Sequence, residues 1–195
     1  MRDILKLGLV LMVIAAVSGG SLAYVHKVTS AVIEERKAKE VAQSMKAVLP
    51  SAEDFRQLDE DELAPVRTDP KFAGVKTVYT GSTGGQVDGV VAMVETSGYG
   101  GKVGLLIGID SRLGVSGIQV LSQSETPGLG TNITKPEFLS QFVGRGAGGA
   151  LAVSKEGGEI QAVTGATISS KAVVAGVNVV RELAIALDVA GGAKR

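Results

Sequence analysis

The sequence contains no cysteine, and His26 is the single histidine among its 195 residues. Without cysteine the chain cannot form disulfides, thiolate zinc sites, conventional iron–sulfur ligation or the covalent attachment of c-type haem. One histidine leaves almost no ligands for a transition metal, so we predict no metal site. Any redox role would therefore require an organic cofactor.

The sequence also lacks an excess of charge of either sign, because 20 Lys and Arg residues balance 20 Asp and Glu residues. It contains no basic stripe interleaved with aromatic side chains, so nothing indicates nucleic acid or another polyanion as a partner. The length allows one globular domain of about 100 to 150 residues and an appendage, which excludes a large multidomain enzyme.

One long apolar run occupies residues 4–25, ILKLGLVLMVIAAVSGGSLAYV, in which Lys6 is the only charge. About 20 apolar residues suffice to span a bilayer as a helix, so we predict a cytoplasmic tail and a transmembrane anchor within residues 1–25. A cleaved signal peptide is the alternative, because Ser21 and Ala23 fit the small-residue positions before a cleavage site.

The orientation of this anchor is predicted from its flanks. Basic residues lie on both sides of the apolar run, so their count barely orients the helix. The short amino-terminal tail and the long remainder favour a cytoplasmic amino terminus, with residues from 26 onward on the extracytoplasmic side of the inner (plasma) membrane. Tyr24 and His26 fit the membrane interface, and His26 is interpreted as an interfacial residue and not as a ligand.

Residues 26–50 are predicted to form a juxtamembrane helix that ends before Pro50, because proline disfavours helical backbone in the residue before it. Val41, Met45 and Val48 recur on one face of this helix, and no Gly or Pro interrupts the segment before Pro50. The helix is therefore expected to lift the following domain off the bilayer.

Residues 51–75 are predicted to connect this helix to the main domain. Ser51 and Asp54 fit the capping pattern of a short helix. The segment from residue 59 to residue 69 is largely polar and is interpreted as a loop.

Residues 76–190 are predicted to form an α+β domain, followed by a tail of residues 191–195. Short runs rich in Val, Ile and Leu alternate with glycine turns, which is typical of an antiparallel meander of strands. The expected strands cover residues 76–80, 86–97, 101–110, 114–123, 151–154 and 159–163.

Two helices are expected to pack around this sheet. Thr134 and Glu137 form a capping-box pattern that opens a helix through residue 143. Residues 169–187 place a stripe of apolar side chains, including Val173 and Val177, on one face of an amphipathic helix. Strands grouped first with helices around them favour the α+β class.

The segment Thr164-Gly165-Ala166-Thr167 lies between a predicted strand and the start of the last helix. A glycine turn followed by a helix amino terminus leaves unpaired N–H groups and the positive end of a helix dipole at one place. An anion, such as a phosphate esterified to the hydroxyl of Thr167, would be stabilised there. An ordinary Thr or Ser helix cap with a glycine turn explains the same residues without a ligand.

Two further glycine-containing loops are candidates for the same site. Glu125-Thr126-Pro127-Gly128-Leu129-Gly130 follows a predicted strand, and its Pro-Gly pair is what a type II turn requires. Such a turn also exposes backbone amides and lets a flat ring approach closely. Ser97-Gly98-Tyr99-Gly100-Gly101 joins two predicted strands as a hairpin connection, where Tyr99 is either an ordinary exposed residue or a stacking partner for a ligand.

Together the three segments resemble the FMN-binding domain family in which the cofactor is attached to threonine by a phosphoester, and in particular the family formed by the G subunits of Rnf electron-transport complexes. QAVTGATISSKAV carries the resemblance most specifically, while SGYGG and ETPGLG occur in the same order at similar distances. The resemblance implies covalent FMN on Thr167 and assigns no catalytic residue. The cofactor-binding residues that it implies are Gly98, Tyr99, Gly100, Glu125, Thr126, Pro127, Gly128, Leu129, Thr164, Gly165, Ala166 and Thr167.

Two positions depart from the family pattern. Gln161 stands where the attachment motif usually has an acidic residue, so its amide keeps an acceptor but loses the charge. Ser122-Gln123-Ser124 stands where relatives often have histidine, which removes one possible proton donor near the ring.

The resemblance implies an electron-transfer subunit of an ion-translocating ferredoxin:NAD oxidoreductase, held in the membrane with the other Rnf subunits and matured by a separate flavin transferase. The sequence has no G-x-G-x-x-G fingerprint that opens a helix, so the isolated chain is expected to hold a flavin without turning over NADH. Two alternatives stay open. One is the C subunit of the sodium-translocating NADH:quinone oxidoreductase, which uses the same attachment chemistry, and the other is an anchored extracytoplasmic module that binds a ligand noncovalently.

Overall fold

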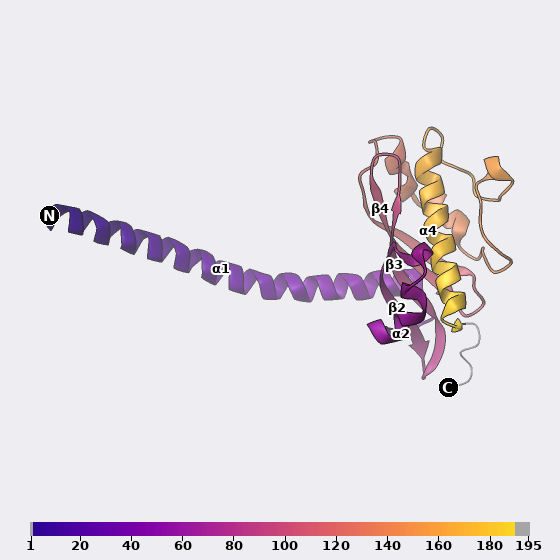
Figure 1. Cartoon of the computed structure of the whole chain (residues 1–195), viewed down its shortest axis with the longest axis horizontal. Helices are drawn as coiled ribbons and strands as arrows, with labels where there is room; N and C mark the ends of the chain where they lie inside the picture. The colour runs from indigo at the N-terminus through magenta and orange to yellow at the C-terminus, as the bar shows by residue number, and fades with distance from the viewer. Residues whose placement is uncertain (1, 190–195) are drawn as a thin grey trace. The chain divides into compact units, whose positions relative to one another are not determined.

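The computed structural model describes residues 2–189, so the predicted tail of residues 191–195 lies outside the described residues. The chain divides into two compact units, Met1–Ala42 and Gln43–Arg195. The first unit is helical, and the second contains a sheet with helices around it (Figure 1).

Helix α1 runs from Arg2 to Val48. The predicted anchor and juxtamembrane helix follow each other within this one helix, with no break between residues 25 and 26. Within the part of the chain that the structure describes, no helix combines the length and the apolar character needed to cross a bilayer. Many side chains of residues 4–25 lie outside that part.

The second unit is built on one antiparallel sheet with the strand order β1-β2-β3-β4-β5. Its hairpin between β2 and β3 uses Gly84 and Gly85, whose φ angles of 59° and 84° fit the positive φ values of a tight two-residue turn. The four strands expected between residues 76 and 123 are therefore confirmed as a meander. The strands are β1 (Asp54–Gln57), β2 (Val75–Thr83), β3 (Gln86–Ser97), β4 (Lys102–Asp110) and β5 (Val115–Gln123).

The segment between α1 and β2 differs from its prediction. The helix expected after Ser51 is wrong, because Asp54 begins strand β1, which pairs antiparallel with β2. The loop expected from residue 59 to residue 69 is also wrong, because Glu60–Arg67 forms helix α2.

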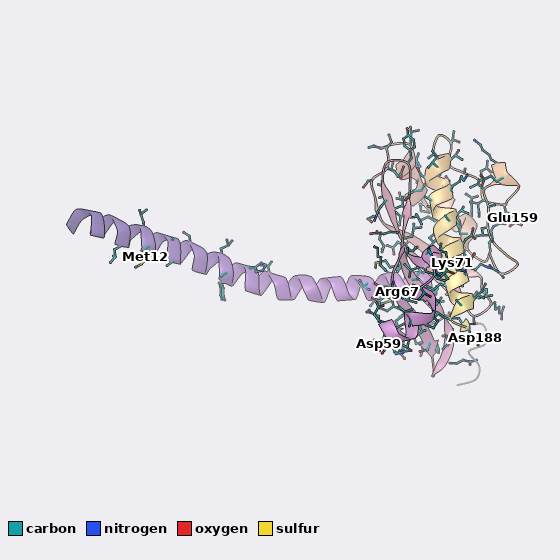
Figure 2. All side chains as sticks on the ribbon, viewed as in Figure 1. Met12, Asp59, Arg67, Lys71, Glu159 and Asp188 are labelled. Carbon is teal, nitrogen blue, oxygen red and sulfur yellow. The ribbon has the colours of Figure 1, made fainter. Side chains whose placement is uncertain are left out.

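Local side-chain bonds explain why α2 forms. The Glu62 carboxylate accepts a hydrogen bond from the Asp59 backbone N–H at 3.0 Å, which satisfies a donor at the helix start. Arg67 pairs with Glu60 at 2.9 Å across the length of the helix. Asp59 and Arg67 mark its two ends in Figure 2. Lys71, which follows in a 3-10 turn (Pro70–Phe72), forms an ion pair with Glu182 of the last helix.

One face of the sheet is covered by helix α4, which spans Thr167–Ala186 and confirms the predicted amphipathic helix (Figure 1). Val173 and Val177 are fully buried and belong to the same apolar cluster as Leu105 of β4. Gly176 lets the helix approach closely, because a Cβ there would lie 2.6 Å from the Leu105 side chain. Burial of such side chains contributes about 1.5 to 3 kcal/mol each.

The opposite face of the sheet receives the carboxyl end of α1 and the residues after it. Val48 and Leu49 are buried there beside Leu106. Ser116 donates a hydrogen bond of 2.6 Å to the Val48 carbonyl. The strand surface under Val48 and Leu49 is made of glycine, and we name these four residues, from four different strands, the glycine floor: Gly81, Gly89, Gly108 and Gly117.

The region between β5 and α4 departs from prediction in two places. The expected helix through residue 143 consists of the short helix α3 (Pro136–Leu139) and a 3-10 turn (Ser140–Phe142), and Thr134 bonds to the Thr131 carbonyl without forming the capping box. The strands expected at residues 151–154 and 159–163 are wrong. The structure has only the isolated bridge between Val153 and Ile160 there, because no neighbouring strand extends the pairing.

Candidate functional site

The loop before α4 is a tight turn fixed to the helix start. The Ala166 N–H donates to the Val163 carbonyl at 2.9 Å, and Gly165 has the φ of 76° that this turn needs. Ser170 accepts a bond from the Val163 N–H at 3.0 Å and donates to the Ala166 carbonyl at 2.9 Å. Thr167 is therefore held as the first residue of α4.

Helix α4 begins at Thr167, and its N-cap residue, Ala166, makes no side-chain capping hydrogen bond. The N–H groups of the first turn of an α-helix have no intrahelical acceptors, and they form the positive end of the helix dipole. Thr167 lies at this position and is half-buried, whereas Thr164 in the preceding turn is exposed. Of the two motif threonines, Thr167 is therefore the one that lies in the first turn of α4.

The loop of residues 97–101 connects β3 and β4. It is closed by a hydrogen bond of 2.7 Å from the Gly98 N–H to the Gly101 carbonyl. The Tyr99 side chain is 71% exposed, so its ring is available at the surface of the loop.

The loop of residues 125–130 contains the predicted turn. The Leu129 N–H donates to the Thr126 carbonyl at 3.2 Å, and Gly128 at the third position has a φ of 77°. These values fit the type II turn expected from Pro127 and Gly128. Leu129 lies against the neighbouring loop, because a Cβ on Gly165 would be 3.0 Å from its side chain.

Glu125 joins all three segments. Its carboxylate accepts hydrogen bonds from the Tyr99 N–H at 2.9 Å, from the Gly100 N–H at 3.3 Å and from the Ser169 hydroxyl at 2.7 Å. The residue is only 6% exposed, so these three donors take the place of water around a buried charge. The carboxylate therefore fixes the β3–β4 loop relative to the first turn of α4.

Two glycines make room for this carboxylate. A Cβ on Gly98 would collide with the carboxylate oxygen of Glu125. A Cβ on Gly130 would lie 2.6 Å from the other carboxylate oxygen and 3.1 Å from the Ser169 hydroxyl. Glycine is required at both positions because any side chain would displace Glu125 from its donors.

The three segments enclose a cavity of about 440 Å³, within the usual range of small-molecule sites. The predicted site residues that line it are Tyr99, Glu125, Thr126, Leu129, Gly165, Ala166 and Thr167. The other predicted residues, Gly98, Gly100, Pro127, Gly128 and Thr164, shape the loops but are not among its lining residues. Thr164 instead lines two neighbouring cavities of about 200 Å³ and 360 Å³.

Three residues of the cavity wall lie outside the predicted segments: Lys155, Ile168 and Ser169. Gly130, which ends the predicted loop of residues 125–130, also lines the cavity. Ile168 and Ser169 lie in the first helical turn after Thr167, so a helix begun at Thr167 instead of residue 169 would have indicated them. Lys155 had no signal in the sequence, because it lies in a glycine-rich stretch before the motif, outside all three predicted segments. Among the described residues, no group of three or more His, Cys, Asp or Glu side chains is arranged to hold a metal ion.

Two family models match this chain. The model of the FMN-binding domain matches residues 98–182, a range that contains every residue lining the cavity of about 440 Å³. The model of the RnfG N-terminal region matches residues 1–48, which cover helix α1.

Individual proteins are also similar to it. A crystal structure of the C subunit of the Na(+)-translocating NADH-quinone reductase from Parabacteroides distasonis is 20% identical, with 74% of this chain and 79% of that chain covered and a TM-score of 0.48. The G subunit of the Na(+)-translocating ferredoxin:NAD(+) oxidoreductase complex of Acetobacterium woodii is 38% identical, over 91% of this chain and 89% of the relative. The G subunit of the ion-translocating oxidoreductase complex of Methanosarcina acetivorans is 37% identical, over 89% and 90%. With such identity to both proteins over nearly their full lengths, the chain belongs to the RnfG family, the G subunits of the ion-translocating oxidoreductase complexes.

Proposed function

We propose that this chain is the flavin-carrying electron-transfer subunit of a membrane-bound, ion-translocating ferredoxin:NAD oxidoreductase of the Rnf type. Family membership supports the assignment, because the relative from Acetobacterium woodii is named as the G subunit of a ferredoxin:NAD(+) oxidoreductase complex and that from Methanosarcina acetivorans as the G subunit of an ion-translocating oxidoreductase complex. The match to the FMN-binding domain supports FMN as the cofactor. The proposal leaves the ion open, since the relative from Acetobacterium woodii is named for sodium and that from Clostridium ljungdahlii for protons.

We further propose that FMN is attached covalently to Thr167 through a phosphoester. One observation carries this choice of residue. Of the two threonines in the motif, Thr167 is the first residue of α4 and lines the cavity of about 440 Å³. Thr164 is exposed and lines only the smaller cavities beside it.

The surroundings of Thr167 suit both parts of FMN. A phosphodiester keeps one negative charge, which the N–H groups at the start of α4 stabilise. The same cavity offers apolar surface from Leu129 and Ile168 and an aromatic ring from Tyr99, which suits a flat ring system. Bound FMN supplies the electron-transfer chemistry, while these residues supply its position and the polarity around it.

The proposed attachment is a group transfer from FAD. A bond forms between the Thr167 side-chain oxygen and the phosphorus of the FMN half, the pyrophosphate bond breaks, AMP leaves, and the hydroxyl proton passes to solvent. We assign this step to a separate flavin transferase, as the resemblance to the FMN-binding family implies. A covalent bond suits an extracytoplasmic site, since it is not governed by a dissociation constant and the flavin is not lost by dilution.

The membrane assignment is part of the same proposal. Residues 1–25 are proposed to be the cytoplasmic tail and single transmembrane anchor, residues 26–50 the juxtamembrane part of the helix, and residues 76–190 the FMN-binding domain on the extracytoplasmic side. The apolar run of residues 4–25 and the RnfG match to residues 1–48 support this arrangement. Amino-terminal sequencing of purified material tests it, and a start at Tyr24 would show that the anchor is cleaved.

Peptide mass spectrometry tests the attachment residue. Protein made together with a flavin transferase is expected to carry a mass increment of FMN less one water on the peptide that contains Thr167. Thr167→Ala should abolish the increment with the fold intact, and Thr164→Ala should retain it as the matched control. The opposite result would move the attachment to Thr164, and a flavin released by denaturation would exclude a covalent bond altogether.

A further inference from the structure

We propose that Lys155 is the side chain that binds and neutralises the phosphodiester linking FMN to Thr167. This inference rests on the proposed attachment and adds a positioning residue to it. Lys155 lies in a different turn from Thr167 and precedes the motif in the sequence. Both residues line the cavity of about 440 Å³ and also the adjoining cavity of about 200 Å³. A phosphate on the Thr167 side-chain oxygen therefore faces the space that Lys155 borders.

The backbone under Lys155 is fixed. Lys155 is the middle residue of a 3-10 turn, Ser154–Glu156, which ends at Gly157 with a φ of 82°. Val153, just before the turn, is buried and forms a parallel bridge with Ile160. The Ser154 N–H donates to the Ile160 carbonyl at 2.8 Å.

A second contact connects this turn directly to α4. Glu156 accepts a hydrogen bond of 2.6 Å from Lys171, which lies one turn after Thr167 on the helix. This pair keeps the turn beside the helix start. Lys171 does not line either of the cavities that Thr167 borders, so it is not the cation that we assign to the phosphate.

Lys155 keeps its charge for a ligand. No carboxylate among residues 2–189, as far as their side chains are described, forms a salt bridge with it. The carboxylate that shares its cavity, Glu125, is already bonded to the Tyr99 and Gly100 amides and to Ser169. Lys155 therefore supplies a cation beside the phosphodiester charge, and the helix amides complete the hydrogen bonding of the phosphate.

Lysine acetylation of the full-length protein in detergent tests the contact. The flavinylated protein is compared with its Thr167→Ala variant, and the acetylation rate of each lysine is read by peptide mass spectrometry. We expect flavinylation to slow acetylation of Lys155 by about two- to fivefold, the size expected of an exposed ion pair. Lys135 is the internal control, because it lines the cavity that contains Thr164 but not Thr167, and its rate should not change.

Slower acetylation of Lys155 could also arise because the flavin covers the lysine without forming an ion pair. The phosphorus NMR signal of the bound FMN distinguishes these two causes. Lys155→Gln should shift this signal, Lys155→Arg should restore it, and Lys135→Gln should leave it unchanged. Peptide mass spectrometry, which locates the FMN, distinguishes the two levels of failure. A chain without FMN on Thr167 overturns the attachment and Lys155's role with it. FMN on Thr167 with unchanged Lys155 acetylation, or with no phosphorus shift in Lys155→Gln, overturns the role of Lys155 alone.

Discussion

Glu125 illustrates how one side chain determines the geometry of the site. Its partners are two backbone N–H groups and one hydroxyl, and an ionised carboxylate is the side chain that only accepts hydrogen bonds. A glutamine at this position would direct its NH₂ group towards N–H groups of the β3–β4 loop, which are donors themselves. The charge is therefore matched to the peptide groups of the β3–β4 loop, even though the residue is nearly inaccessible to water.

We predict that Glu125→Ala destabilises the protein by about 2 kcal/mol, because it leaves buried donors without an acceptor. Glu125→Gln should cost less, since its remaining oxygen can still accept from the Tyr99 N–H. Chemical denaturation of protein made without the flavin transferase measures both. Glu137→Ala, an exposed carboxylate on α3, is the control and should stay within about 0.5 kcal/mol of the unaltered chain. Equal effects of Glu125→Ala and Glu137→Ala would contradict the connecting role.

A second prediction concerns pH and helix α2. The side-chain hydrogen bond from Arg56, followed by the bond from the Asp59 N–H, lowers the pKa of Glu62 from 4.5 to about 2. Because the folded pKa is depressed, the stabilising contribution is present above the ordinary pKa of 4.5 and is lost as the pH falls through about 2. Carboxyl-carbon NMR should show this low midpoint, and Arg56→Gln should raise it towards 4.5. A midpoint unchanged by Arg56→Gln would disprove the assigned cause.

At the scale of elements, the glycine floor makes a further prediction. A Cβ on Gly117 would lie 2.6 Å from the Val48 backbone, and one on Gly108 would collide with the Val48 carbonyl. Gly117→Ala and Gly108→Ala should each lower the unfolding free energy by about 1 to 3 kcal/mol, since the chain at Val48 must move off the sheet. Gly148→Ala is the matched control, because its Cβ would meet no atom within 4 Å. Thermal unfolding measures the stability of each variant. A loss of stability in Gly148→Ala as large as in Gly117→Ala and Gly108→Ala would contradict this packing.

The elements differ in how well the sequence predicts them. Strands β2 to β5 contain long runs rich in Val and Ile that are bounded by glycine, so the composition and the turn residues are enough to predict them. Strand β1 is four residues long and mostly exposed, and pairing with β2 decides its structure. Helix α2 contains Pro65 and four acidic or basic residues among eight, and it is held by the burial of Leu63 and Val66 together with exposed Glu–Arg contacts that sequence patterns do not reveal.

The site follows the same division. The glycine turns before Leu129 and Ala166 are readable from the sequence, because a positive φ favours glycine. Other features of the site depend on contacts between separate segments of the chain. They are the buried contacts of Glu125 with the β3–β4 loop and Ser169, and the position of Lys155 at the cavity that Thr167 lines. Sequence spacing carries no information about those contacts, so only the three-dimensional arrangement could reveal them.

At the scale of the whole molecule, we predict that the isolated chain does not oxidise NADH even when fully flavinylated. Gly144, Gly146 and Gly149 have the spacing of a dinucleotide fingerprint, but they lie in a loop and no helix begins after them until a short 3-10 turn at Ser154–Glu156. Electron transfer should instead require partner subunits. Turnover of NADH with a soluble dye, in a preparation free of other subunits, would contradict this prediction.

The glycine floor also determines the order in which the domain can be completed during synthesis. Val48 and Leu49 leave the ribosome early, but the surface that receives them is finished only when Gly117 on β5 has been made and paired with β4. Until then only part of the native surface that these apolar residues cover can exist. The end of α1, which is translated before the whole sheet, is consequently among the last parts of the second unit to reach its final contacts.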